Sequence, residues 1–338
     1  MMNLMDWFKN IFQKNRIYLD YAAATPMLWA VQRAMWKYLS REFYNPNAIY
    51  REGVKVKKEV EEYRTKIARI LGVSKDSIIF TSGGTEANTL AVRGVGPGKV
   101  IIEPDSHPSV TDAAKKTSST KIVLISSPTT DNSLGRKIRE ERKNLPAGRQ
   151  GKTPYPLLHI DASQSAQYFN VSLESLACDL LTLDAAKIYG PKGIGALVVR
   201  RGVELDLPPQ GTPAVPLIAG FAKALEIAAR DRERESKRLS LLSGQFSKAI
   251  QENFPEAIVT QTLPNIVNVF VPGILPEFLV LALDRAGLMV SAGPACNAHK
   301  PEPPETPVRF SLGRFTTEKE LNKATEILCR TVENMIKS

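Results

Sequence analysis

The sequence has few of the features that mark secreted or membrane proteins. Its 338 residues include three cysteines (Cys178, Cys296 and Cys329), too few for a disulfide framework, which indicates a reducing, cytoplasmic environment. No apolar run approaches the roughly 18 residues that a membrane span requires. Residues 1–16 lack the unbroken apolar core and the small-residue cleavage site of a secretion signal. We therefore predict that they form an amphipathic helix packing on the protein body, with binding to a membrane surface as the alternative.

The basic residues are scattered along the chain, although the formal net charge is +10. Basic residues alternate with acidic ones in residues 55–62 and again in 230–238, a pattern typical of a solvated helix face. The charge therefore predicts no specific nucleic-acid binding, while an acidic protein partner or a transiently bound RNA stays open. The glycine spacings of a P-loop and of a dinucleotide-binding turn are also absent.

Short apolar runs of strand length recur along the first two thirds of the chain, and polar residues follow them. We predict strands at residues 77–80, 99–103, 121–126, 157–161, 180–183 and 196–199. Helical segments lie between several of these runs, which predicts an α/β fold with a mainly parallel sheet. Such sheets bind ligands at the carboxyl ends of their strands. The polar residues that follow those ends are Thr85, His107, Asn132, Asp161, Gln164 and Lys187.

Two of these positions suggest a specific chemistry. Lys187 stands between an apolar strand and a turn with Gly190, where burial and neighbouring groups can lower an amine's pKa enough for Schiff-base formation. Residues 81–88 place Gly83 and Gly84 between a strand and a helix start, which points free N–H groups at a phosphate. Taken singly, a solvated lysine and a simple helix cap at Thr85 are the alternatives. A lysine, a carboxylate, a histidine and a phosphate turn together are what pyridoxal phosphate requires.

The length of the chain predicts two domains. Prolines and a glycine at 208–213 mark the boundary, so we predict a large cofactor-binding domain at 17–212. Residues 213–338, with 1–16 packing on them, form a linker helix and a small C-terminal domain. That domain carries a proline-rich loop with Cys296, which suits an exposed nucleophile, whereas Cys178 and Cys329 are predicted to be buried and inert. Residues 144–156 are predicted to be a surface loop, and His159 a core residue.

These motifs, in this order, resemble those of cysteine desulfurases of the NifS/IscS kind. Such enzymes belong to the class V aminotransferase-like, fold type I enzymes that use pyridoxal 5′-phosphate. The matching segments cover almost the whole chain: residues 18–26, 80–86, 161–165, 187–193, 293–296 and 308–316, together with His107. The resemblance implies a large domain whose mainly parallel sheet is flanked by helices, a smaller α/β C-terminal domain, and a homodimer.

The resemblance also implies how each residue contacts the cofactor. Lys187 holds it as a Schiff base and moves protons, Asp161 keeps its ring nitrogen protonated, and His107 stacks on the ring and assists proton transfer. The remaining implied cofactor contacts are a hydrogen bond from Gln164 to the phenolic oxygen, the phosphate turn at Gly84 and Thr85, a cofactor-facing Asn132, and Thr212, which reaches the phosphate of the other subunit.

For the substrate, the resemblance implies that Arg309 binds the carboxylate of L-cysteine, with Asn132 contacting both substrate and cofactor. The Cys296 thiolate then attacks the substrate's sulfur, which leaves a persulfide on the enzyme and releases L-alanine. An acceptor protein takes that sulfur for iron–sulfur cluster assembly or tRNA thiolation.

The chain departs from the family at two places. Asp184 and Ala186 replace a usual serine and histidine beside the phosphate, and a glycine-rich segment before Gly211 is missing. Two alternatives stay open for this reason: a selenocysteine lyase or other class V enzyme, and a cofactor-poor scaffold that only binds sulfur-transfer partners.

Overall fold

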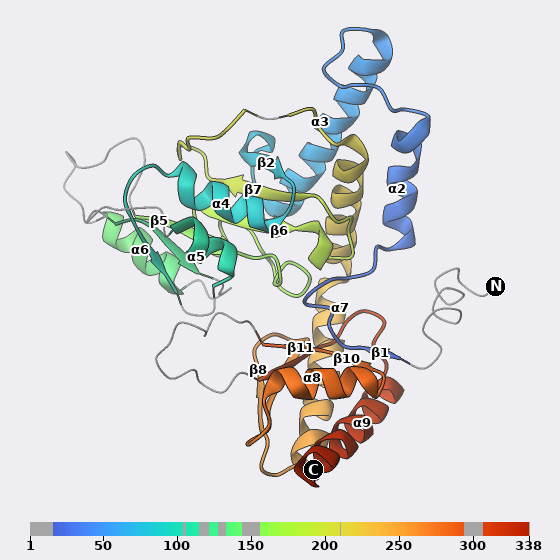
Figure 1. The fold of residues 1–338 in the computed structure, drawn as a ribbon. Helices are drawn as coiled ribbons and strands as arrows, with labels where there is room; N and C mark the ends of the chain where they lie inside the picture. The colour runs from blue at the N-terminus through green and yellow to red at the C-terminus, as the bar shows by residue number, and fades with distance from the viewer. Residues whose placement is uncertain are drawn as a thin grey trace. The chain divides into compact units, whose positions relative to one another are not determined.

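The computed structural model describes residues 16–103, 106–114, 122–127, 133–143, 156–209, 211–293 and 307–337 (Figure 1). Contacts divide the chain into a large unit, Thr25–Glu233, and a small unit made of Met1–Ala24 and Arg234–Ser338. Helix α7 (Val215–Asn253) runs through this division, whereas the sequence placed a boundary at residue 212, before the helix. The predicted helix at residues 1–16 and the predicted loop at 144–156 lie almost entirely outside the described residues.

The large unit is built on a six-stranded sheet with the order β2-β7-β6-β5-β4-β3. Strand β7 pairs antiparallel with both of its neighbours, and the other five strands share one direction. The predicted mainly parallel α/β sheet is therefore confirmed. The strands are β2 (Ile78–Thr81), β3 (Lys99–Ile102), β4 (Ile122–Ser127), β5 (Leu157–Asp161), β6 (Leu180–Asp184) and β7 (Gly195–Val199).

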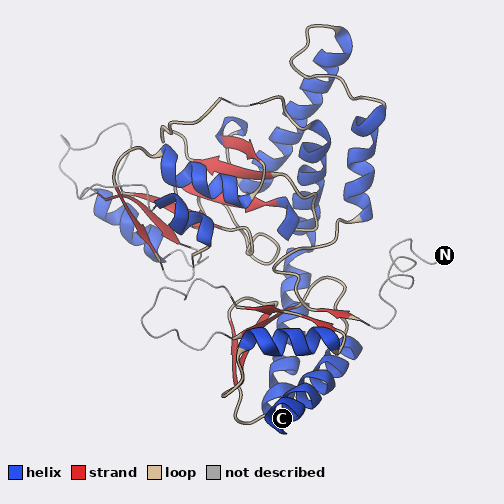
Figure 2. Cartoon of the chain, viewed as in Figure 1, coloured by secondary structure: helices blue, strands red, loops and turns tan. Residues whose placement is uncertain are grey.

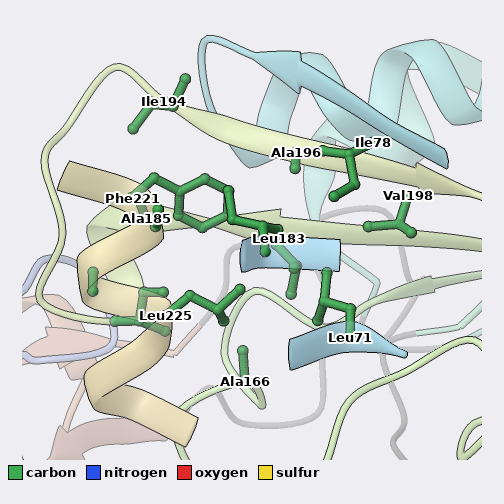
Figure 3. Close-up of a cluster of buried hydrophobic side chains, with 14 of the residues drawn as sticks. Leu71, Ile78, Ala166, Leu183, Ala185, Ile194, Ala196, Val198, Phe221 and Leu225 are labelled. Carbon is green, nitrogen blue, oxygen red and sulfur yellow. The ribbon is translucent and has the colours of Figure 1, made fainter. Parts of the chain in front are cut away.

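Helices cover both faces of this sheet (Figure 2). Alternate strand residues point to opposite faces, so Leu157 and Leu180 join one core cluster and Leu158 and Leu183 join the other. The first cluster packs against α4 (Gly84–Gly94) and α5 (Pro108–Ala114), and the second against α2 (Trp29–Ser40), α3 (Arg51–Leu71) and the start of α7. Figure 3 shows Leu183 in the second cluster with Leu71 and Phe221. Each leucine buried in this way contributes about 1.5–3 kcal/mol.

Local signals in the sequence explain where two helices lie. Helix α3 ends at Gly72, whose φ of 66° is left-handed and suits glycine. On α2, Leu39 is exposed and Tyr38 is buried. The reason is that the Tyr38 hydroxyl is bonded to Glu59 (2.5 Å) and to Tyr63 (3.0 Å), both on α3.

The small unit contains a four-stranded antiparallel sheet, order β11-β12-β9-β8, and a parallel pair of β1 with β10. Its remaining helices are α8 (Pro276–Arg285) and α9 (Glu318–Lys337). No helix among the described residues is long and apolar enough to cross a membrane. The strands are β1 (Ile17–Tyr18), β8 (Ile258–Gln261), β9 (Ile266–Phe270), β10 (Leu288–Met289), β11 (Ser291–Ala292) and β12 (Val308–Ser311).

Candidate active site

The carboxyl ends of the parallel strands bring the predicted cofactor residues to one edge of the large unit's sheet. The turn with Thr85 follows β2, and His107 follows β3. Asp161 is the last residue of β5, and Lys187 follows β6 at the end of the 3₁₀ helix η3 (Ala185–Lys187). Because these strands share one direction, their carboxyl ends meet at the same edge, where α/β proteins bind ligands.

The carboxylate of Asp161 is held on both oxygens. Its Oδ1 accepts the backbone N–H of Ser163 at 3.0 Å, and its Oδ2 accepts the side-chain amide of Asn88 at 2.7 Å. Asn88 lies on the buried face of α4, where an apolar residue is usual. The sequence prediction did not include Asn88, and its polar side chain on an otherwise apolar helix face was the available signal.

The side chain of His107 is anchored through one ring nitrogen. Its Nδ1 lies 2.7 Å from the hydroxyl of Ser109 and 3.2 Å from the backbone N of the same residue. The Ser109 hydroxyl in turn lies 2.9 Å from the Asn88 amide nitrogen. His107 and Asp161 are therefore joined through two residues that the sequence prediction missed.

His159 is the core residue that the sequence predicts. It is completely buried, and its Nε2 lies 2.9 Å from the Thr182 hydroxyl. Burial lowers its pKa to about 4, against the opposing effect of Asp161, so the imidazole is neutral at physiological pH. We assign it no direct contact with a ligand.

The start of α4 has the shape of a phosphate-binding turn. Gly83 has a φ of 151°, which side chains rarely adopt, and a Cβ on Gly84 would lie 3.1 Å from the Ser163 hydroxyl. The first N–H groups of a helix have no partner within it and attract anions. The Ser163 hydroxyl is buried and has no hydrogen-bond partner among the described residues. It therefore offers a further donor at the turn.

Asp184 brings a negative charge to the same turn. Its Oδ2 accepts the N–H of Gly84 at 3.3 Å, and its Oδ1 accepts the N–H of Ala186 at 2.8 Å. The carboxylate thus lies against a helix N–H group that a phosphate would also use. The pairing of Asp184 with Ala186 also caps the 3₁₀ helix that carries Lys187.

The backbone around Lys187, whose side chain is half-buried, is fixed on both sides. The Thr25 hydroxyl donates to the Ala186 carbonyl at 2.8 Å and accepts the Tyr189 N–H at 2.9 Å. Tyr189 is buried with a φ of 63°, a left-handed conformation that is uncommon for a bulky residue and persists only where its surroundings enforce it. These contacts fix the position of the lysine at the edge of the sheet.

Arg309 belongs to the small unit, on β12. One terminal nitrogen donates to Asp20 Oδ1 at 3.1 Å, while its Nε is buried without a hydrogen-bond partner in the described part of the chain. Asp20 is positioned by its bridge to Ser311, two residues further along β12. An edge of the guanidinium thus remains able to bind a carboxylate.

Comparisons with known proteins identify the family of the chain. The family model "Aminotransferase class-V" matches residues 17–145, 112–210 and 208–323. "Cysteine desulfurase IscS" of Dictyoglomus turgidum is 31% identical over 383 aligned positions, which cover 95% of this chain and 96% of that protein. "Cysteine desulfurase IscS 1" of Archaeoglobus fulgidus is also 31% identical, with 94% and 97% covered.

A solved structure with the same fold is titled "NIFS-LIKE PROTEIN". It has a TM-score of 0.82 and 24% identity, and covers 94% of this chain and 100% of that chain. The chain belongs to the class V aminotransferase family. The predicted family resemblance and fold type are therefore confirmed. Class V aminotransferases and cysteine desulfurases depend on pyridoxal 5′-phosphate.

The residues of this class V chain fit that cofactor. The buried Ser163 hydroxyl has no partner among the described residues, and the turn at Gly84 has no side chain, so a phosphate finds donors there. A carboxylate held by two N–H groups, Asp161, is suited to a pyridine nitrogen that carries a proton. Lys187 supplies the amine, and Gln164 follows directly after the Ser163 turn.

The structure leaves three predicted residues of this class V chain untested. Asn132 and Cys296 lie outside the described residues. Thr212 is exposed on the large unit, and its contact to the phosphate of a second subunit stays a prediction. The alignment with the Dictyoglomus protein spans 383 positions, more than the 338 residues here, so that relative contains segments that this chain lacks. Their predicted place, before Gly211, stays a prediction.

Proposed function

We propose that the protein is a pyridoxal-phosphate-dependent cysteine desulfurase, which converts L-cysteine to L-alanine and transfers the sulfur to Cys296 as a persulfide. The observation that carries this proposal is the edge where Lys187, Asp161, His107 and the Gly84 turn follow parallel strands, in a chain whose curated relatives are named cysteine desulfurases. The acceptor of the sulfur is expected to be a protein of iron–sulfur cluster assembly or tRNA thiolation.

The cofactor, when bound, supplies a sink for the electrons of the substrate's carbon. Asp161 holds a proton at the ring nitrogen, and the Lys187 amine takes and returns the substrate's protons. His107 would lie against the ring, and Gln164 would donate to the phenolic oxygen. The N–H groups at the start of α4 and the Ser163 hydroxyl bind the phosphate.

The proposed reaction needs a residue that binds the substrate carboxylate and a residue that acts as the nucleophile. Arg309 binds the substrate carboxylate with its free edge, a bidentate task for which lysine is less suited. The Cys296 thiolate forms an S–S bond to the substrate sulfur as the C–S bond breaks, and the electron pair stays with the substrate carbon. That carbon then takes a proton, which gives L-alanine.

The first test of the proposed activity is the visible absorption spectrum of the protein. Adding pyridoxal phosphate to the purified protein is expected to produce the visible absorption of the bound cofactor, and L-cysteine plus a reductant then to yield alanine and sulfide. A protein that stays colourless would instead support the scaffold alternative. Comparing the turnover of cysteine, selenocysteine and cysteine sulfinate separates a desulfurase from a selenocysteine lyase.

Asp184 is expected to weaken cofactor binding because its carboxylate and the phosphate meet the same N–H group. Two like charges within hydrogen-bonding range repel by about 1–4 kcal/mol, depending on the effective dielectric. Asp184→Ser and Asp184→Asn should therefore lower the dissociation constant of pyridoxal phosphate by about fivefold or more, measured by absorbance titration. Glu204→Gln, which removes an exposed charge elsewhere, is the matched control and should bind as wild type. Equal affinities in all four proteins would show that Asp184 turns away from the phosphate.

A homodimer is supported by an apolar surface on the large unit. Trp29 and Trp36 lie seven residues apart on one side of α2, and Trp36 is 69% exposed. Exposed patches of this kind are typical of protein interfaces. The other large exposed apolar residues on α2, the segment after it and the first turn of α3 are Leu39, Phe43, Ile49, Tyr50 and Val54.

Trp36→Glu is expected to convert the dimer to a monomer in sedimentation velocity, because a charge would be buried at the interface. Leu281→Glu, at a 58% exposed position on α8, is the control and should leave the mass unchanged. A wild-type protein that sediments as a monomer would contradict the dimer, and a dimeric Trp36→Glu variant would place the interface elsewhere.

A further inference from the structure

A chain of hydrogen bonds through two buried residues, Asn88 and Ser109, connects the two side chains that contact the cofactor ring in the proposed function. It runs from Asp161 Oδ2 to Asn88 (2.7 Å), from Asn88 to the Ser109 hydroxyl (2.9 Å), and from that hydroxyl to His107 Nδ1 (2.7 Å). Asn88 is 1% exposed and Ser109 is 8% exposed, so the bond between them is shielded from water, while His107 at the end of the chain of bonds is exposed. Asp161 comes from β5, Asn88 from α4 and Ser109 from the start of α5, and His107 directly precedes α5.

The chemistry of the groups gives each bond a direction. An ionised carboxylate only accepts, so the Asn88 amide nitrogen faces Asp161 and donates to it. The same nitrogen donates its second hydrogen to the Ser109 hydroxyl oxygen. The Asn88 carbonyl oxygen is left buried without a partner in the described chain, which shows that these two donor contacts set the orientation of the amide.

The same assignment of donors and acceptors extends to the imidazole of His107. The Ser109 hydroxyl accepts from Asn88, so its single hydrogen is free to point at His107 Nδ1. The backbone N–H of Ser109 also points at Nδ1, at 3.2 Å, and can only donate. Nδ1 therefore accepts two hydrogen bonds. A neutral imidazole carries one N–H, which must then be on Nε2.

We propose that Asn88 and Ser109 are positioning residues that hold His107 as the Nε2–H tautomer and fix Asp161 by the same chain. This inference rests on the proposed function, because it assigns the proton that His107 exchanges during the reaction to Nε2. Ser109 acts on the imidazole, and Asn88 acts on both Ser109 and the carboxylate. Neither residue touches the substrate.

The test is nitrogen NMR of the holoenzyme with ¹⁵N-labelled histidine, at a pH above the titration of free histidine. The chain has three histidines, and the buried His159 provides an internal reference for the fold. We expect Nδ1 of His107 to resonate as an unprotonated nitrogen and Nε2 as a protonated one. In Ser109→Ala, which removes one donor, both signals should shift toward a mixture of tautomers, while Ser109→Thr keeps the wild-type pattern.

Turnover provides the second readout. Ser109→Ala should lower kcat for L-cysteine by roughly tenfold with little change in KM, since proton transfer at a well-placed base contributes on the order of 100-fold or more. Ser109→Thr should restore it, and unchanged His159 signals exclude a general folding defect. Asn88→Ala is the second variant and should shift the same two nitrogens.

Protonated Nδ1 in the wild type, or identical nitrogen shifts and kcat in Ser109→Ala, would overturn the inference. A protein that shows the expected tautomer but turns over no cysteine would contradict the proposed function and leave the inference standing.

Discussion

Lys187→Ala is expected to abolish the formation of alanine from cysteine while leaving the fold intact. The lysine is half-buried at the sheet edge, and the Thr25 hydroxyl holds the turn through the backbone groups of Ala186 and Tyr189, so these bonds stay when the amine is removed. The amine both holds the cofactor and moves protons, and general acid–base catalysis alone contributes about 100- to 10,000-fold. Alanine and sulfide production should therefore fall by at least about 100-fold, and the visible absorption of the bound cofactor should change.

Lys192→Ala is the matched control for this experiment. Lys192 lies in the same glycine-rich turn and is exposed, so its loss should leave both the spectrum and the turnover near wild type. A Lys187→Ala protein with wild-type turnover would show that another amine holds the cofactor. Reduction of the wild-type holoenzyme with borohydride, followed by peptide mapping, should place the covalent label on Lys187.

The second large effect is expected from Cys296→Ala, which should bind pyridoxal phosphate normally but form no persulfide. The thiolate is the nucleophilic form of cysteine, and neither of the other two thiols favours it. Burial raises the pKa of Cys178 to about 12, and burial with the nearby Glu333 raises the pKa of Cys329. A raised pKa keeps a thiol protonated at neutral pH, and the thiolate gains population only as the pH rises toward that pKa.

Mass spectrometry after a single addition of L-cysteine should therefore find the extra sulfur on the peptide with Cys296. Cys329→Ala is the control, because this thiol is half-buried and its removal should leave persulfide formation unchanged. Iodoacetamide at neutral pH should label Cys296 far faster than Cys178. Normal desulfuration by Cys296→Ala would remove this thiol from the proposed mechanism.

The sequence predicts the positions of the strands, and the residues at their carboxyl ends, better than the direction of each strand. The strands that end at Asp161 and before Lys187 were visible as short apolar runs, because strands buried on both faces carry continuous apolar residues. The sequence analysis did not assign the direction of β7, since an antiparallel strand in such a sheet has the same apolar composition. The antiparallel pairing follows from the short turn between β6 and β7, a span too short for a crossover helix.

The supporting residues of the site were not predicted, for a different reason. Asn88 and Ser109 lie within helices rather than at strand ends, and nothing in the sequence places α4 beside α5 and β5. Asp184 was noticed as a departure from the family, but only the structure shows its oxygen on the Gly84 N–H. Contacts between distant segments decide all three cases, and hydrophobic periodicity carries no information about them.

The pairing of the first strand with the last part of the chain determines when the small unit can form. Ala22 donates its N–H to the Ser311 hydroxyl across 289 residues, and Ile17 and Tyr18 pair with Leu288 and Met289. During synthesis, the N-terminal segment must therefore wait until nearly the whole polypeptide has left the ribosome, while the continuous Thr25–Glu233 unit is already complete. Long-range closure of this kind is slow, so a nascent chain exposes the apolar residues of its first strand for most of its translation.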